Sequence, residues 1–178
     1  MSGEGIPDLE LGKAAEHLVV ADLILSGYRA YLTEQGLPYD VVVDHEGNLY
    51  RVQVKASRRA KRMPQRAMVT PGYLYNVRRA GKAGRRQYAD DEFDIVALVA
   101  MDVRIVAYLP FKVQILQTIC LRPPGHVGSA RTARTRTIDQ FPVEAAMAAL
   151  TGKRPTLAPR AEAVRVVARD QGRLFEIA

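Results

Sequence analysis

Two short apolar segments separated by a tight turn constrain the fold of this chain more than any other feature. Asp40–Val43 and Leu49–Ala56 flank His45-Glu46-Gly47-Asn48, a pattern that predicts a β-hairpin. Side chains alternate between the two faces of a strand, so Gln53 and Lys55 are expected on one face of the second strand. The acid that opens the first strand would then converge with an amide and a lysine. Such a group is suited to holding a divalent cation beside a phosphate.

Helical and extended patterns surround this hairpin. Pro7 and Asp8 open a helix predicted to run to about Ser26. Its expected apolar face, with one acid in it, consists of Leu11, Ala14, Ala15, Leu18, Asp22 and Leu25. Short strands are predicted at Tyr28–Leu32, Phe93–Met101 and Arg104–Leu109, and Gln35–Tyr39 is a predicted turn.

The second half of the chain is expected to supply two more helices. Phe111–Cys120 fits neither period, and the preceding Pro110 favours a helix. Pro142 and Gly152 bracket a helix over Val143–Leu150. Together these elements predict an α/β fold, with a mixed central sheet flanked by helices.

Composition limits the classes of protein to consider. A chain of 178 residues is most simply one domain, and its single cysteine, Cys120, excludes an intramolecular disulfide and a cysteine-based zinc site. We therefore expect a reducing, cytoplasmic setting. Apolar runs such as Leu18–Val20 and Ile95–Met101 are too short to span a bilayer, and the first residues do not resemble a signal peptide. The net charge of +7 favours an anionic partner.

Basic residues are concentrated in the middle of the chain. From Arg51 to Tyr88 there are twelve Lys or Arg and no Asp or Glu, with tyrosines among them. Its Gly and Pro residues predict loops around one short strand near Tyr73–Val77, suited to following a phosphate backbone. The alternative is a basic surface that only aids solubility. The residues expected to contact nucleic acid are Arg58, Arg59, Lys61, Arg62, Arg78, Arg79, Arg85 and Arg86.

A second basic segment, residues 122–137, is rich in Gly, Pro, Ser and Thr and has no hydrophobic period. It predicts a loop in which Arg131, Arg134 and Arg136 contact phosphates or base edges. A merely solvated connection fits the same composition.

Four segments in order resemble the PD-(D/E)XK nuclease superfamily. They are a helix carrying Glu16, the dipeptide Tyr39-Asp40, the strand Arg51-Val52-Gln53-Val54-Lys55-Ala56-Ser57, and Tyr88–Asp94 followed by Ile95–Met101 and Tyr108-Leu109-Pro110. More narrowly, the chain is similar to the branch associated with bacterial group I introns, whose homing endonucleases carry Gln where most relatives carry Glu. The resemblance covers roughly residues 10–111 and implies a restriction-endonuclease-like core.

The resemblance also implies a site for Mg²⁺ or Mn²⁺. Asp40 would be the anchoring carboxylate, the Gln53 amide oxygen and the Val54 backbone carbonyl would be further ligands, and Glu16 would hold a hydration water. Lys55 would orient or deprotonate the attacking water, or stabilise the transition state. Because Gln replaces Glu, the site has one negative charge fewer, which predicts weaker cation affinity and slower turnover.

Several of these residues have simpler structural alternatives. Glu16 would also fit a solvent-facing position or an ion pair with Lys13, and Asp40 after Pro38 would fit turn chemistry. A lysine in a buried strand needs a negative partner, which argues against a purely structural Lys55. We assign Asp44 to the hairpin turn, Asp94 to structural hydrogen bonding, Tyr39 to core packing, and no catalytic role to His17, His45, His126 or Cys120.

Three functional hypotheses follow. The first is a Mg²⁺-dependent, sequence-specific endonuclease of the homing or mobile-element kind, acting on double-stranded DNA as a homo-oligomer, a dimer or tetramer. The second is a structure-selective nuclease resembling Holliday junction resolvases. The third is a non-catalytic DNA-binding protein on a nuclease fold. In each, residues 1–152 form the nuclease-like domain with basic loops at 56–88 and 122–137, and residues 153–178 are a C-terminal appendage.

Overall fold

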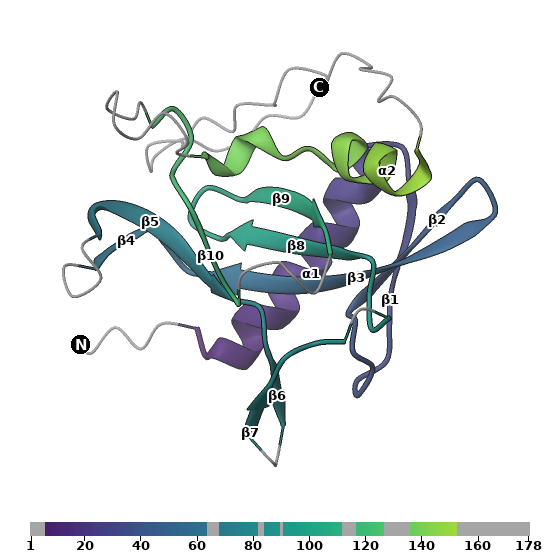
Figure 1. Ribbon diagram of the computed structural model, residues 1–178, viewed down its shortest axis with the longest axis horizontal. Helices are drawn as coiled ribbons and strands as arrows, with labels where there is room; N and C mark the ends of the chain where they lie inside the picture. The colour runs from purple at the N-terminus through teal and green to yellow at the C-terminus, as the bar shows by residue number, and fades with distance from the viewer. Residues whose placement is uncertain are drawn as a thin grey trace, which may run out of the picture.

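A mixed five-stranded sheet forms the centre of the molecule (Figure 1). The structure is a computed structural model that describes residues 6–63, 68–81, 84–89, 91–111, 117–126 and 136–152. In spatial order the strands are β1 (Arg29–Leu32), β2 (Val41–His45), β3 (Asn48–Ser57), β8 (Ile95–Ala100) and β9 (Ile105–Pro110). The β3–β8 pair is parallel and the other neighbours are antiparallel, so the predicted mixed sheet is confirmed.

The hairpin that dominates the sequence is formed by β2 and β3. Its turn is tighter than predicted, because His45 and Asn48 pair with each other and leave only two residues between the strands. Glu46 and Gly47 both have positive φ, 51° and 78°, as a type I′ turn requires. This turn fixes the register that places Val41 opposite Val52, at the end of the hairpin where Asp40 enters.

Helix α1 (Asp8–Leu25) has nearly the predicted bounds but buries a different face. Ala15, Val19 and Leu23 are fully buried, whereas Leu25, a member of the predicted face, is 88% exposed. The buried stripe lies roughly a quarter turn from the predicted one at 100° per residue. The apolar residues from Leu18 to Leu25 surround most of the helix, so periodicity alone does not select the face that meets the sheet.

Both helices cover the same face of the central sheet. Val52 and Val54 of β3 join α1 and α2 (Val143–Thr151) in one hydrophobic core. The predicted limits of α2 are confirmed, since Pro142 precedes its first residue and Gly152 follows its last with φ 70°.

The opposite face is covered by a second sheet rather than by a helix. This sheet has the order β10 (Thr118–Leu121), β5 (Met68–Asn76) and β4 (Lys61–Met63). Tyr73 and Tyr75 of β5 pack against the central strand β8 in a second core, which also includes Ile138 of the 3-10 helix η3 (Ile138–Gln140). The central strand is therefore buried along its whole length.

The helix predicted over Phe111–Cys120 is wrong where the structure describes it. Residues 118–121 form strand β10, and Thr118 to Leu121 pair with Asn76 to Tyr73 of β5. Residues 112–116 lie outside the described residues. The cross-strand partners are distant in sequence, so the local pattern did not reveal this pairing.

The basic stretch contains two hairpins where loops around one short strand were predicted. One is β4–β5 and the other is β6 (Arg79–Gly81) with β7 (Gly84–Arg86). Figure 1 shows the two hairpins projecting from the central sheet in different directions. The short strands β4, β6 and β7 carry charged residues. These residues hide the alternation of apolar and polar positions by which strands are predicted.

No helix among the described residues is long and apolar enough to cross a membrane. The predicted boundary at residue 152 falls at the end of α2. Residues 127–135 and the predicted appendage at 153–178 lie outside the described residues.

Candidate active site

Asp40 lies at the mouth of the β2–β3 hairpin, where the sheet register directs its carboxylate at β3. Its backbone N–H donates to the Val52 carbonyl at 2.9 Å. Its Oδ2 accepts the Val54 N–H at 2.8 Å and a hydrogen bond from Gln53 Nε2. The side chain is thus held by the next strand, and turn chemistry does not account for its position.

Gln53 is 6% exposed, and every polar atom of its amide has a partner. Nε2 donates to Asp40 Oδ2 and, at 3.1 Å, to the Val54 carbonyl. Oε1 accepts from the Tyr88 hydroxyl at 3.1 Å. Two acceptor oxygens therefore converge on the position that the amide nitrogen occupies.

Lys55 lies on the same face of β3 as Gln53, because both side chains contact the Tyr88 hydroxyl. Its Nζ donates to that hydroxyl at 3.0 Å and to the Arg78 carbonyl at 3.5 Å, and it lies 5.2 Å from the centre of the Tyr88 ring. Burial lowers the pKa of Lys55, and the negative charge of Asp40 opposes this shift. The ammonium is held mainly by neutral groups, with one carboxylate near enough to favour its charge.

Glu16 faces Asp40 from helix α1. Burial raises the pKa of the half-buried Glu16, and the charge of Asp40 raises it further. Burial also raises the pKa of Asp40, against the opposing effects of the Val54 N–H, Lys55 and Gln53. The rotation of α1 relative to the predicted face brings Glu16 to the edge of the buried stripe. On the predicted face it would have pointed away from the sheet.

The donor set fits a hard divalent cation. The site offers the Asp40 and Glu16 carboxylates and the Val54 carbonyl, and a half-turn of the Gln53 amide would add a fourth oxygen. The pKa of both carboxyl groups is raised by burial, and that of Glu16 also by the charge of Asp40, so a bound cation would supply a missing positive charge. Among the described residues there is no group of three or more His, Cys, Asp or Glu, so a cation here would keep several waters.

The structure adds Tyr88 to the site, a residue that the sequence analysis placed in the basic stretch and at the start of a family-like segment but gave no role in the site. Its hydroxyl joins Gln53 to Lys55, and its ring packs edge-on against Phe93 at 4.8 Å between centroids. The alternation of β3 predicts a partner on that face, but nothing local identifies one 33 residues beyond Lys55.

Asp94 has the structural role that the sequence suggested. Its carboxylate binds the Arg51 guanidinium through two hydrogen bonds, of 3.1 and 3.0 Å, and accepts the Arg51 backbone N–H at 2.8 Å. The start of β8 is thereby fixed beside β3, close to the active-site residues.

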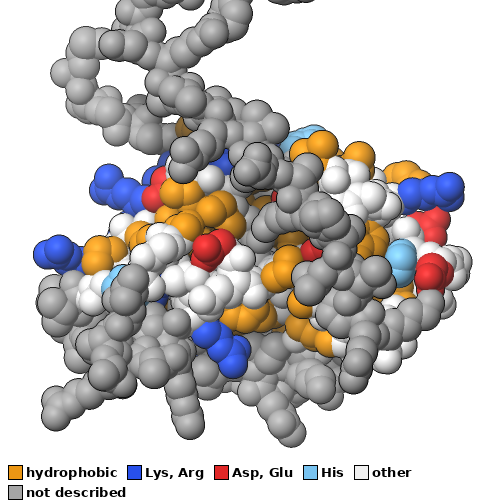
Figure 2. All heavy atoms as spheres, turned by 90° about the horizontal axis from the view of Figure 1, so that it is seen from above, with side chains coloured by type: hydrophobic (Ala, Val, Ile, Leu, Met, Phe, Trp, Pro, Cys, Tyr) orange, Lys and Arg blue, Asp and Glu red, His pale blue; other side chains and the backbone are white. Residues whose placement is uncertain are grey.

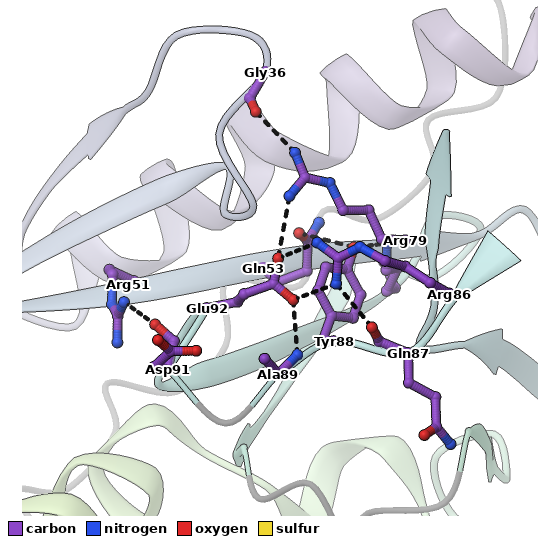
Figure 3. Close-up of polar contacts among 11 residues, drawn as sticks. Gly36, Arg51, Gln53, Arg79, Arg86, Gln87, Tyr88, Ala89, Asp91 and Glu92 are labelled. Carbon is purple, nitrogen blue, oxygen red and sulfur yellow. Dashed lines mark hydrogen bonds and ion pairs between the residues drawn. The ribbon is translucent and has the colours of Figure 1, made fainter. Parts of the chain in front are cut away.

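Two of the arginines expected to contact DNA are engaged by Glu92. Figure 3 shows Arg79 and Arg86 meeting this one carboxylate, at 3.1 Å from Arg79 and 2.7 Å from Arg86. The second nitrogen of Arg79 donates to the Gly36 carbonyl at 2.9 Å, and the Ala89 N–H donates to Glu92 at 2.7 Å. These contacts tie the β6–β7 hairpin to the loop before Asp40, and DNA contact by either arginine stays a prediction.

The other expected DNA contacts are distributed over the surface. Arg58 donates to Asp8 and to the Ile6 carbonyl. The exposed members are Arg59, Lys61, Arg62, Arg78 and Arg136, while Arg131, Arg134 and the side chain of Arg85 lie outside the described residues. On the face in Figure 2 the basic side chains stand apart from one another, with hydrophobic, uncharged and a few acidic side chains between them.

Comparisons with known proteins agree with this geometry. Residues 8–145 match the sequence profile of the PD-(D/E)XK endonuclease family, a span that includes the whole candidate site. A search of curated proteins finds no significant match. Among solved structures, "The structure of a bacterial homing endonuclease: I-Ssp6803I" is similar, with a TM-score of 0.60 and 21% identity over 83% of this chain and 96% of that one. This likeness shows the restriction-endonuclease-like fold, and the profile match shows that the chain belongs to the PD-(D/E)XK endonuclease family.

Proposed function

We propose that the protein is a metal-dependent endonuclease that hydrolyses phosphodiester bonds in double-stranded DNA. The observation that carries this proposal is the convergence of the Asp40 carboxylate, the Val54 carbonyl and the Gln53 amide, with Lys55 on the same face of the strand. Glu16 of helix α1 lies near enough for the charge of Asp40 to raise its pKa, and it would complete the site.

Each residue has a distinct task in the proposed reaction. The chemistry supplied by Mg²⁺ or Mn²⁺, when bound, is charge neutralisation at the phosphate and a more acidic water. Asp40, Val54 and Gln53 would hold the cation, and Glu16 would orient a water of its hydration shell. Lys55, whose pKa is lowered by burial, is suited to orienting the attacking water or accepting its proton.

Several features support DNA as the substrate and a homing role. The central basic segment bears two projecting hairpins, and a two-stranded β-ribbon fits the major groove of duplex DNA. The similar solved structure is titled a bacterial homing endonuclease, which favours a sequence-specific enzyme over a junction resolvase.

The proposed enzyme acts as a homo-oligomer in the cytoplasm. Cutting both strands requires two active sites facing opposite strands, which a symmetric assembly of identical subunits provides. The chain carries one cysteine and no pair that oxidation within the chain would join.

The test is cleavage of a mixed pool of long duplex DNA by the wild type, Asp40→Ala and Asp44→Ala, with Mg²⁺, Mn²⁺ or EDTA. Asp44 is a matched control, because it lies on β2, the strand that Asp40 immediately precedes, and it forms an ion pair with Arg29 at 3.9 Å. We expect discrete fragments from the wild type and Asp44→Ala that require the metal and vanish with Asp40→Ala. Salt-sensitive binding with no cleavage on any pool that contains the binding site would instead indicate the non-catalytic alternative.

A further inference from the structure

A continuous chain of hydrogen bonds runs through the candidate site from a cation to an anion. Lys55 Nζ donates to the Tyr88 hydroxyl at 3.0 Å, Tyr88 donates to Gln53 Oε1 at 3.1 Å, and Gln53 Nε2 donates onward to Asp40. Figure 3 shows the Tyr88 ring lying against the Gln53 side chain. The two end groups of this hydrogen-bond series fix the direction of donation, because an ammonium only donates and an ionised carboxylate only accepts.

This direction turns the amide the wrong way for binding a cation. With Nε2 toward Asp40 and the Val54 carbonyl, the ligating oxygen Oε1 points at Tyr88. A half-turn of the amide brings Oε1 toward the two acceptors and Nε2 toward the hydroxyl. Tyr88 accommodates both states, since its hydroxyl donates in one and accepts in the other. In the second state the Tyr88 hydroxyl still accepts a hydrogen bond from Lys55, and its own O–H no longer donates to Gln53.

We propose that Tyr88 is a positioning residue that keeps the Gln53 amide hydrogen-bonded when its oxygen turns toward a cation, and that also holds Lys55, so that a neutral glutamine serves as a cation ligand. This inference rests on the proposed function. A carboxylate at position 53 would not need the same partner, because either of its oxygens presents an acceptor to the cation.

Tyr88 is itself held firmly enough for this task. It is 6% exposed, and its ring packs edge-on against Phe93 and Phe111, with centroids 4.8 and 6.3 Å away. Burial, together with the charge of Asp40, raises the pKa of Tyr88 to about 12, so the hydroxyl keeps its hydrogen at neutral pH. Tyr88→Phe would remove the hydroxyl and retain the ring contacts.

The experiment measures Mn²⁺ affinity by calorimetric titration without DNA, with thermal unfolding as a check on folding. The variants are Tyr88→Phe, Gln53→Glu, the double variant, Asp40→Ala, and Tyr75→Phe as the matched control. Tyr75 is also a buried tyrosine of the second core, and its hydroxyl has no hydrogen-bond partner among the described residues. Its removal should leave Mn²⁺ affinity unchanged.

We expect Tyr88→Phe to weaken Mn²⁺ binding about tenfold or more in the wild-type background, the usual effect of losing a group that orients a metal ligand. In the Gln53→Glu background the same change should cost less than about threefold. An equal loss in both backgrounds, or an equal loss in Tyr75→Phe, would overturn the inference.

Two further results keep the inference and the proposed function separable. Binding that is absent in the wild type, or unaffected by Asp40→Ala, overturns the proposed function and this inference with it. If Gln53→Glu does not fold, side-chain amide NMR replaces it. Mg²⁺ should then shift the Gln53 amide signals in the wild type and not in Tyr88→Phe, and equal shifts in both would refute the role of Tyr88.

Discussion

At the scale of single residues, the candidate site places a lysine where burial disfavours its charge. Burial lowers the pKa of Lys55, and its direct partners are a phenol oxygen and a backbone carbonyl. Contact with phosphate alone does not explain a buried lysine, because exposed lysines bind phosphate without the cost of desolvation.

Lys55→Met should therefore abolish cleavage and leave DNA affinity within a few fold. The matched variant is Lys61→Met, which changes an exposed lysine on β4 in the expected DNA-contacting segment. It should weaken DNA binding, reduce its salt dependence and leave the chemical step intact. Binding isotherms at several salt concentrations, with single-turnover cleavage, separate the two effects. A similar loss of DNA affinity in both variants would reduce Lys55 to a phosphate contact.

The residues of the site differ in how far the sequence could predict them. The shared face of Gln53 and Lys55 is predictable, because strand alternation allows two faces and the hairpin turn fixes the register. The orientation of Glu16 is not, because α1 is apolar on most sides and the sheet selects the buried stripe. Tyr88 depends on a contact between distant segments, which no local pattern encodes.

At the scale of elements, one acid anchors the β6–β7 hairpin to the body of the protein. Glu92 is 13% exposed at its side chain and binds Arg79 and Arg86, and Arg79 also reaches Gly36. The hydrogen bonds from Arg86, with further ones from Ala89 and Arg79, lower the pKa of Glu92 from 4.5 to about 2. The acid that balances the basic stretch lies just beyond its end, where a count over the stretch itself misses it.

Glu92→Gln should loosen the β6–β7 hairpin and lower the free energy of unfolding at pH 7 by about 2 kcal/mol, a figure reduced for the partial exposure of Arg86. The pKa is depressed in the folded state, so this stabilisation is present above about pH 4.5 and lost as the pH falls toward 2. Hydrogen exchange across Arg79–Arg86, with urea unfolding at pH 7 and pH 3, measures both effects. Asp91→Asn is the control, because Asp91 is an exposed neighbouring acid that accepts a hydrogen bond from Arg51 through its backbone carbonyl. A loss of the same size at pH 3 would contradict the assignment to this carboxylate.

Elements with a clear local run of apolar residues were predictable, and the short basic strands were not. The limits of the central strands and of both helices were predicted to within a few residues. In the basic stretch β5 reaches the second core through Tyr73 and Tyr75, where one strand was predicted, whereas the β6–β7 hairpin is held by backbone pairing and the ion pairs of Glu92. Strand β10 was mistaken for a helix because its pairing with β5 spans more than forty residues of sequence.

At the scale of the whole molecule, the net charge of +7 should make DNA binding strongly dependent on salt. Arg131→Ala combined with Arg134→Ala should weaken binding and lower the slope of log affinity against log salt by about 2, close to 0.9 for each lost phosphate contact. Arg29→Ala with Arg104→Ala removes the same charge from exposed positions outside both basic segments and should change the slope less. Equal slopes for the two double variants would assign the effect to net charge alone.

The connection between the parallel strands β3 and β8 has a consequence for how such a protein can evolve. Its ends are fixed by the sheet and by the bond between Arg51 and Asp94. The parts of the connection between them are not equally free to change. The exposed residues of β4 can change without touching either core, whereas Tyr73 and Tyr75 of β5 are core residues and the part from Arg78 to Glu92 holds Lys55 and Gln53 in place. Selection for a new recognition sequence should therefore accumulate changes in β4 and spare the other two parts.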